Sequence, residues 1–107
     1  KLYGLREDYN KSVNHYSNAV KTQPLNITAK QNLAAAYISA DLKENAVSVY
    51  EQIIKVDTKN WDSYYELGKL YISLDKKAEA KTILEGVLNK NPNYSKAAEI
   101  RSILSSL

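Results

Sequence analysis

The feature that most constrains this 107-residue chain is a repeat of its own sequence at an offset of 34 residues. Residues 27–60 and 61–94 align without a gap and are identical at eight positions. Typical residue frequencies would supply about two identities by chance over such a window. The identical pairs are Leu33/Leu67, Tyr37/Tyr71, Ile38/Ile72, Ser39/Ser73, Asp41/Asp75, Lys43/Lys77, Ala46/Ala80 and Glu51/Glu85. This period predicts an array of stacked repeats, in which each unit buries its core against a neighbour.

Each period has the pattern of two helices separated by a short polar break. In both halves of residues 61–94, apolar residues recur at intervals of three and four positions, which places them on one face of an α-helix. They are Leu67, Leu70, Tyr71 and Leu74 in the first half, and Ala80, Ile83, Leu84, Val87 and Leu88 in the second. Residues 73–77 separate the halves, and Asn91-Pro92-Asn93 ends the period because proline cannot continue a helix. The sequence therefore predicts an all-α fold of antiparallel helix hairpins.

The two ends of the chain fit the same register as incomplete units. Because Tyr3 holds the register position of Tyr37, residues 1–6 are expected to end a first helix, with a turn at Arg6–Asp8 and a second helix up to Thr22. The last residues carry apolar positions at helical spacing opposite a polar face, which is typical of the helix that ends such an array. We predict a partial repeat at residues 1–26, complete repeats at residues 27–60 and 61–94, and a capping helix at residues 95–107.

Composition excludes several classes of chemistry. The chain has no cysteine and one histidine, His15, which excludes a disulfide scaffold and a thiolate zinc site and disfavours a catalytic zinc site. The net charge is +3, but lysines alternate with acidic residues instead of forming the basic stripe of a nucleic-acid binder. No apolar run approaches the length of a membrane span. We expect no metal, no cofactor, no nucleic-acid partner and no membrane span.

The repeated positions resemble the tetratricopeptide repeat (TPR), and the resemblance covers essentially the whole chain. Residues 61–94 carry Tyr64, Leu67, Gly68, Tyr71, Ala80, Leu84, Val87 and Pro92 at the family's signature places. Residues 27–60 carry Lys30, Leu33, Ala34, Tyr37, Ala46, Tyr50, Ile53 and Thr58 there. The departures, such as Asp41 and Asp75 where the family often turns with glycine, leave length and spacing intact. The resemblance implies a right-handed superhelical solenoid of about two and a half units plus a C-terminal capping helix.

The resemblance also implies a non-catalytic scaffold whose first helices line a concave groove that binds a peptide or a partner helix. The groove positions would be Gln31, Asn32, Ala35, Ser39, Asp62, Tyr65, Glu66, Lys69, Ile72 and Lys96. The amides of Gln31 and Asn32 can pair with an extended backbone, and Tyr65 offers an apolar face with a polar tip. Asp62 and Glu66 stand where carboxylate-binding members of the family carry cations. We therefore expect a neutral or basic partner rather than an acidic one.

Two other functions compete with peptide binding. Asp62 and Glu66, one helical turn apart, have the spacing of a carboxylate pair for acid–base work, but the sequence supplies no nucleophile beside them, so we do not expect an enzyme. A structural or oligomerisation segment is the stronger alternative, because the incomplete first repeat would leave an apolar stripe partly uncovered and so favour self-association. This stripe is Val13, Tyr16, Ala19 and Val20. For Tyr64 and Tyr65, packing is a stronger interpretation than ligand anchoring.

Overall fold

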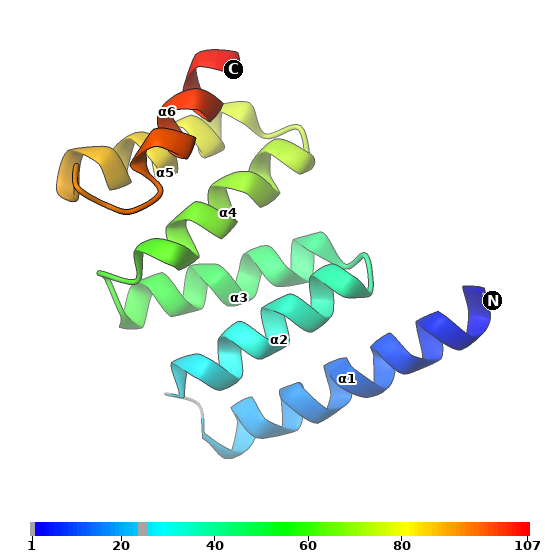
Figure 1. The fold of residues 1–107 in the computed structure, drawn as a ribbon. Coiled ribbons are helices and arrows are strands. Elements are labelled where there is room, and N and C mark those ends of the chain that lie inside the picture. Colours follow the sequence, from blue (N-terminus) through cyan, green and yellow to red (C-terminus); the bar gives the residue numbers. More distant parts are fainter. Residues whose placement is uncertain (1, 24–25) are drawn as a thin grey trace. The chain divides into compact units, whose positions relative to one another are not determined.

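The computed structural model of the chain describes residues 2–23 and 26–107, with side-chain surroundings described from residue 11 onward. That part of the chain contains six helices and no strand, which confirms the predicted all-α fold (Figure 1). The helices are α1 (Leu2–Thr22), α2 (Ile27–Ser39), α3 (Lys43–Val56), α4 (Trp61–Ser73), α5 (Lys77–Lys90) and α6 (Ala97–Ser106). Among the described helices, none combines the length and apolar character needed to cross a membrane.

The helices divide into two compact units, Lys1–Asp57 with α1 to α3 and Thr58–Leu107 with α4 to α6. In the first unit, α2 packs against both α1 and α3. In the second unit, α5 packs against both α4 and α6. Helices α2 and α3 form an antiparallel hairpin, as do α4 and α5 (Figure 1). The hairpins therefore follow the predicted 34-residue register.

The turn inside each hairpin is closed by an aspartate in the left-handed region. Asp41 and Asp75 both have a φ angle of 61°. After Asp41, the backbone amide of Leu42 donates to the carbonyl of Tyr37 at 2.8 Å, and the same bond recurs 34 residues later at 2.7 Å. This is the Schellman arrangement, in which glycine is the usual left-handed residue, and aspartate is one of the few others that tolerate it.

The start of each hairpin is capped by an asparagine. The side chain of Asn26 accepts a hydrogen bond from the backbone amide of Ala29 at 3.0 Å. Asn60 accepts the equivalent bond from the amide of Ser63 at 3.2 Å. Each cap satisfies one of the amides that the first turn of a helix leaves unpaired. Both first helices therefore begin at the same point of the repeat.

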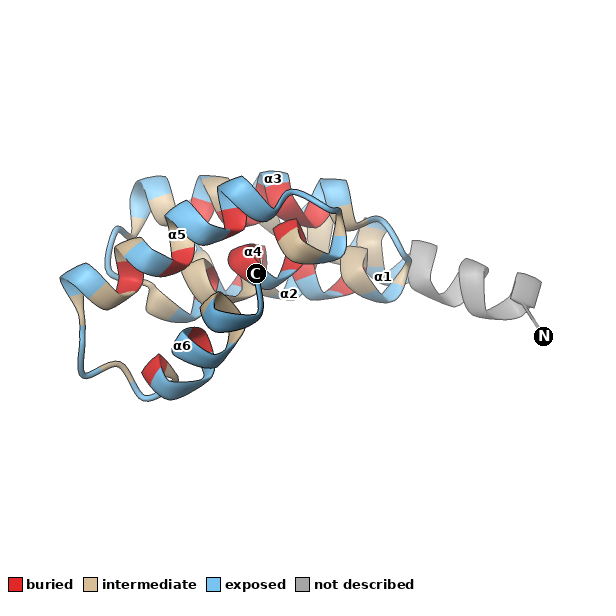
Figure 2. Cartoon of the chain, turned by 90° about the horizontal axis from the view of Figure 1, so that it is seen from above, coloured by how far each residue is buried: buried red, intermediate tan, exposed pale blue. Residues whose placement is uncertain are grey.

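The core of each hairpin depends on a small residue facing a large one. A Cβ atom added to Gly68 would lie 2.5 Å from Cδ2 and 2.7 Å from Cγ of Leu84, which is too close for any side chain. At the same places in the first unit, Ala34 is fully buried and Tyr50 nearly so. Figure 2 shows buried positions alternating with exposed ones along α3 and α5, as expected for helices that bury one face.

The turn predicted at Arg6–Asp8 is wrong, because α1 runs without interruption from Leu2 to Thr22. The register explains the difference. The position that Asp41 and Asp75 occupy in the two observed turns is held by Glu7 in α1. Glutamate is a strong helix former and lacks the tolerance of aspartate for the left-handed region.

The apolar stripe of α1, which we expected to be partly uncovered, is half-buried at all four of its positions. The packing of α1 against α2 provides this partial cover. The capping helix matches its predicted apolar face at Ala97 and Ile100, which are buried, and at Leu104, which is half-buried. Leu107, in contrast, is exposed, because α6 ends at Ser106.

Candidate functional site

The sequence-predicted binding residues fall in both units, four on α2 and the others on α4 or at the start of α6. In the first unit, Asn32, Ala35 and Ser39 are exposed, and Gln31 is half-buried beside them. The three exposed residues lie three and four positions apart and so share one face of α2. It is the face of α2 that we predicted from sequence to bind a partner.

The exposed face of α2 borders a hollow of about 260 Å³. Its lining comes from two helices, with Ser12 and Tyr16 on α1 and Asn32, Ala35, Ala36 and Ser39 on α2. None of these lining residues is charged. The hollow therefore offers hydroxyl and amide groups around small apolar side chains, a surface for an uncharged group.

In the second unit, two lysines lie close to the ring of Tyr65. The Nζ atom of Lys69 is 4.7 Å from the centre of the Tyr65 ring, and the Nζ atom of Lys96 is 4.8 Å from it. Both distances are within the range of cation–π contacts, which hold the ring and the two ammonium groups together. Tyr65 is half-buried and also packs against the core formed by Leu84, Val87 and Ile100. Its ring therefore serves the core and the surface at once.

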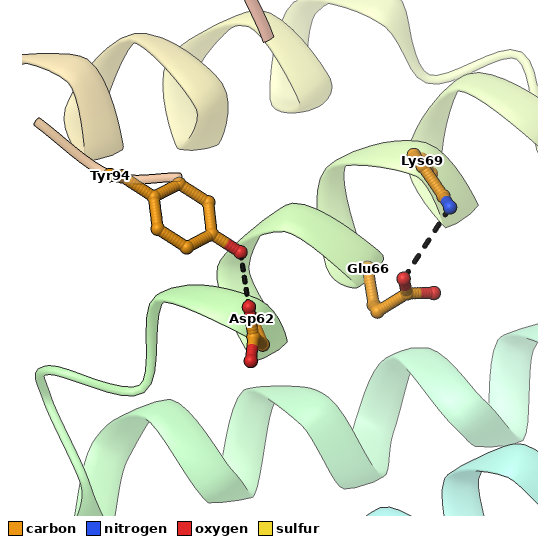
Figure 3. Close-up of polar contacts among 4 residues, drawn as sticks. All are labelled: Asp62, Glu66, Lys69 and Tyr94. Atoms are coloured by element: carbon orange, nitrogen blue, oxygen red, sulfur yellow. Dashed lines mark hydrogen bonds and ion pairs between the residues drawn. The ribbon is translucent and has the colours of Figure 1, made fainter. Parts of the chain in front are cut away.

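Lys69 has a second contact on the same helix. Its Nζ atom lies 3.4 Å from Oε1 of Glu66, one turn away on α4 (Figure 3). Both side chains are partly exposed, so this ion pair contributes at most about 0.5 kcal/mol to stability. Its effect is to hold Lys69 near Tyr65. Within the described part of the chain, Lys96 makes no such ion pair.

Tyr94 connects the start of α4 to the segment that precedes α6. Its hydroxyl donates a hydrogen bond to Oδ1 of Asp62, 32 residues away in sequence, and Figure 3 shows the two side chains pointing toward each other. Burial, and then the hydrogen bond and charge of Asp62, raise the pKa of Tyr94 well above its ordinary value. The Tyr94 hydroxyl therefore remains protonated and donates to Asp62 at neutral pH. Sequence reasoning gave Tyr94 no role, because no helical spacing relates it to Asp62.

Other aromatic and apolar residues of α4 are used mainly for packing. Trp61 stacks on Tyr64 with ring centres 5.7 Å apart, and the Tyr64 hydroxyl donates to the carbonyl of Thr58 at 3.2 Å. Ile72, assigned to the groove from sequence, is half-buried and packs against the core of its unit. Ile72, like Tyr65, is therefore shared between the core and the surface.

The described side chains bring together groups suited to binding by hydrogen bonds, charge and aromatic contact. Among these residues, no three potential metal ligands from His, Asp and Glu lie close together.

Two second helices, α3 and α5, also border hollows away from the predicted binding residues. One of about 500 Å³ lies between α1, α2 and α3, and one of about 350 Å³ lies between α4 and α5.

Comparison with known proteins agrees with this architecture. A family model described as tetratricopeptide repeat matches residues 44–104, which is more than half of the chain. The chain belongs to the tetratricopeptide repeat family. A second TPR model matches residues 27–60.

Two solved structures show the same TPR fold over nearly the whole chain. The Arabidopsis OM64 TPR domain is 27% identical, with a TM-score of 0.77, and the match covers 94% of this chain and 83% of that one. The first TPR of Spaghetti (RPAP3), bound to the HSP90 peptide SRMEEVD, is 26% identical, with a TM-score of 0.75 and coverages of 97% and 85%. No curated protein matches the chain in sequence.

Proposed function

We propose that this TPR protein is a non-catalytic interaction module that binds a peptide or a partner helix through the exposed faces of its first helices, α2 and α4. The observation that carries the proposal is the position of the Tyr65 ring within cation–π distance of the ammonium groups of both Lys69 and Lys96. An aromatic ring with two cations close to it offers both aromatic and charged groups to a partner's side chains and backbone. The similar TPR structure that holds an HSP90 peptide lends support to a peptide partner.

The face of α2 supports the same proposal with different chemistry. The exposed amide of Asn32 can donate to and accept from a peptide backbone, and Ser39 adds a hydroxyl nearby. The small side chain of Ala35 leaves the hollow open beside them. A partner backbone would be held by the polar groups, while a small uncharged side chain enters the hollow.

The charges on α4 favour a neutral or basic partner over an acidic one. The carboxylate of Asp62 accepts a hydrogen bond from Tyr94, and the ammonium of Lys69 forms an ion pair with Glu66. Of the cations described on this face, Lys96 makes no ion pair, whereas α4 carries two carboxylates, Asp62 and Glu66, that would repel a partner's carboxylate. Juxtaposed like charges weaken binding, so an acidic peptide end is disfavoured.

A pair of double variants tests the binding faces. Peptides selected from a random library on the wild-type protein are used as probes in titration calorimetry. Asn32→Ala combined with Lys69→Glu should weaken binding about tenfold, because both changes alter exposed groups on the first helices. Asn45→Ala combined with Lys81→Glu makes the same chemical changes at exposed positions of the second helices and should leave the affinity unchanged. Equal effects of the two double variants would place the binding site elsewhere.

The charge preference has its own test. The selected peptides should be enriched in neutral and basic residues, and replacing a neutral residue of a selected peptide by glutamate should lower its affinity. Tighter binding of the glutamate peptides would overturn the charge preference while leaving the binding faces in place.

A further inference from the structure

The hollow of about 500 Å³ in the first unit is lined by residues of α1, α2 and α3. Its apolar and aromatic side chains are Val20, Leu33, Tyr37 and Val49, of which Leu33 and Val49 are buried. The other lining residues are polar and come from the two outer helices, α1 and α3. Binding sites commonly have this size and combine an apolar lining with a few polar groups.

Two residues of opposite charge stand at opposite ends of this hollow. Helices α1 and α3 run in the same direction, since each packs antiparallel to α2 (Figure 1). Lys21 lies in the last turn of α1, whereas Glu44 lies in the first turn of α3. Both residues are exposed, and neither forms an ion pair within the described part of the chain. Each charge is therefore available to a ligand.

The face of α1 that borders the hollow is not the face with which a second helix contacts the first helix of its own hairpin. It contributes Ser17, Val20 and Lys21 to the lining. In the two complete hairpins, the residues at these register positions remain exposed or half-buried, although each second helix is packed against its own first helix. They are Glu51, Ile54 and Lys55 in α3, and Glu85, Leu88 and Asn89 in α5. The hollow therefore lies apart from the contact within a hairpin.

The second hairpin has a hollow at the same register positions, but its lining lacks the pair of opposite charges. This hollow has a volume of about 350 Å³ and is lined by Tyr71, Ala78, Glu79, Thr82 and Ile83. The same register positions in the first hairpin are Tyr37, Glu44, Asn45, Ser48 and Val49, all of which line the larger hollow. The repeat therefore produces the hollow, and the first unit adds a lysine from α1 to the carboxylate of α3.

We propose that the hollow of the first unit binds an extended peptide segment of a partner, one that carries a basic residue at the Glu44 end, an aliphatic residue in the middle and an acidic residue at the Lys21 end. Opposite charges at the two ends of a site favour a segment with both signs and disfavour one with a single sign. The apolar lining between them accepts the aliphatic side chain. This site lies outside the exposed faces of α2 and α4, so it is additional to the binding proposed for those faces.

The wall formed by α3 fits an extended backbone. Asn45, Ser48 and Gln52 follow one another at intervals of three and four residues, which places them along one face of α3. Their amides and hydroxyl can donate to and accept from backbone groups. From Glu44 to Gln52 this wall is about 12 Å long. Five residues of extended chain span about 13 Å, and their first, third and fifth side chains point to the same side.

Nuclear magnetic resonance titrations of the isotopically labelled chain with peptides blocked at both ends test the proposal. The mixed-charge probe is Lys-Ser-Leu-Ser-Glu, and the two single-charge probes are Lys-Ser-Leu-Ser-Lys and Glu-Ser-Leu-Ser-Glu. Wild type should bind the mixed-charge probe about fivefold more tightly than either single-charge probe, because each of those places one of its charges beside a like charge of the hollow.

Reversing one charge of the hollow should change the preferred probe. Lys21→Glu should bind the probe with two lysines most tightly, and Glu44→Lys should bind the probe with two glutamates most tightly. The matched controls are Lys90→Glu and Glu99→Lys, at exposed positions in the last turn of α5 and the first turn of α6. Both controls should keep the wild-type preference, and circular dichroism verifies that all four variants keep their helix content.

The signals that shift locate the bound probe. Ser17, Asn45, Ser48 and Gln52 should shift with the mixed-charge probe, whereas a peptide bound to the first helices should leave Asn45 in place. Either kind of binding can therefore be lost while the other is retained. Equal affinity for the three probes, or preferences that Lys21→Glu and Glu44→Lys leave unchanged, would overturn the proposal. So would shifts of the same signals that depend on protein concentration without peptide, since a second copy of the chain would then occupy the hollow.

Discussion

The hairpin of α2 and α3 and the hairpin of α4 and α5 share a frame but differ on the face of their first helices. Both begin with an asparagine cap and turn through an aspartate at a φ angle of 61°. The equivalent positions on their half-buried and exposed surfaces differ, with Gln31, Asn32 and Ala35 on one and Tyr65, Glu66 and Lys69 on the other. The register fixes the positions that cap, turn and pack. It leaves the positions between them free to carry different binding chemistry.

The two hairpins also solve one packing problem in two ways. Where the helices approach, the second hairpin places Gly68 against Leu84, and the register puts Ala34 and Tyr50, both buried, at the equivalent positions of the first. Adding a methyl group to one side of such a pair requires a change on the other, because interiors are close-packed.

Among the variants that test the difference between the two hairpins, Gly68→Ala is expected to change the free energy of unfolding most. The added Cβ would meet Leu84, which is fully buried and cannot move away, so the free energy of unfolding should fall by about 2–3 kcal/mol. The reciprocal change, Ala34→Gly, adds no contact and should cost only about 1 kcal/mol, the penalty for glycine within a helix. Urea denaturation followed by circular dichroism measures both. Equal costs would show that the contact with Leu84 does not limit this position.

A second difference lies one turn into each first helix, where Ser63 replaces Ala29. The Ser63 hydroxyl is buried and has no hydrogen-bond partner among the described residues. Ser63→Ala should therefore raise the free energy of unfolding by about 1–2 kcal/mol, since a buried unpaired hydroxyl is costly. Ala29→Ser places a hydroxyl at the equivalent buried site and should lower stability. A loss of stability in Ser63→Ala would mean that the hydroxyl has a partner.

A third test removes the contact that only the second unit has. Tyr94→Phe deletes the hydroxyl that donates to Asp62 and should lower the free energy of unfolding by about 1 kcal/mol at neutral pH. Because folding raises the pKa of Tyr94, its contribution is fully present below about pH 10, where the unfolded tyrosine starts to ionise. It is lost as the pH rises further. Wild type should lose stability above that pH more steeply than Tyr94→Phe, and identical pH profiles would contradict the assignment.

The smallest effect is expected at the two turns. Asp41→Gly and Asp75→Gly should each raise the free energy of unfolding by about 0.5 kcal/mol, because glycine adopts the left-handed region without a steric penalty. Thermal unfolding of the single and double variants measures the gain. Opposite signs at the two positions would show that the turns are not equivalent.

The sequence predicted the features that depend on spacing along one helix. The 34-residue period located both complete hairpins and the apolar faces of their helices. The period also predicted a turn at Arg6–Asp8, where α1 is in fact continuous. This prediction ignored that Glu7, and not an aspartate, holds the register position of Asp41 and Asp75. The type of residue at the left-handed position therefore indicates whether the chain turns there or continues as a helix.

Contacts between segments far apart in the chain could not be predicted from the sequence. The bond from Tyr94 to Asp62 and the approach of Lys96 to Tyr65 both depend on how the start of α6 comes back to α4. No periodicity relates these residues. Three of the four predicted groove positions on α2 are exposed and Gln31 is half-buried, but the hollow beside them depends on Ser12 and Tyr16 of another helix.

The most direct test of peptide binding by the first helices is a nuclear magnetic resonance titration of the isotopically labelled chain with a selected peptide. The backbone and side-chain amide signals of α2 and α4 should shift most, with Asn32, Ser39, Tyr65 and Lys69 among them. Signals of exposed second-helix residues such as Asn45 and Lys81 should stay in place. Shifts that cluster on α3 and α5 would contradict the assignment of binding to the first helices.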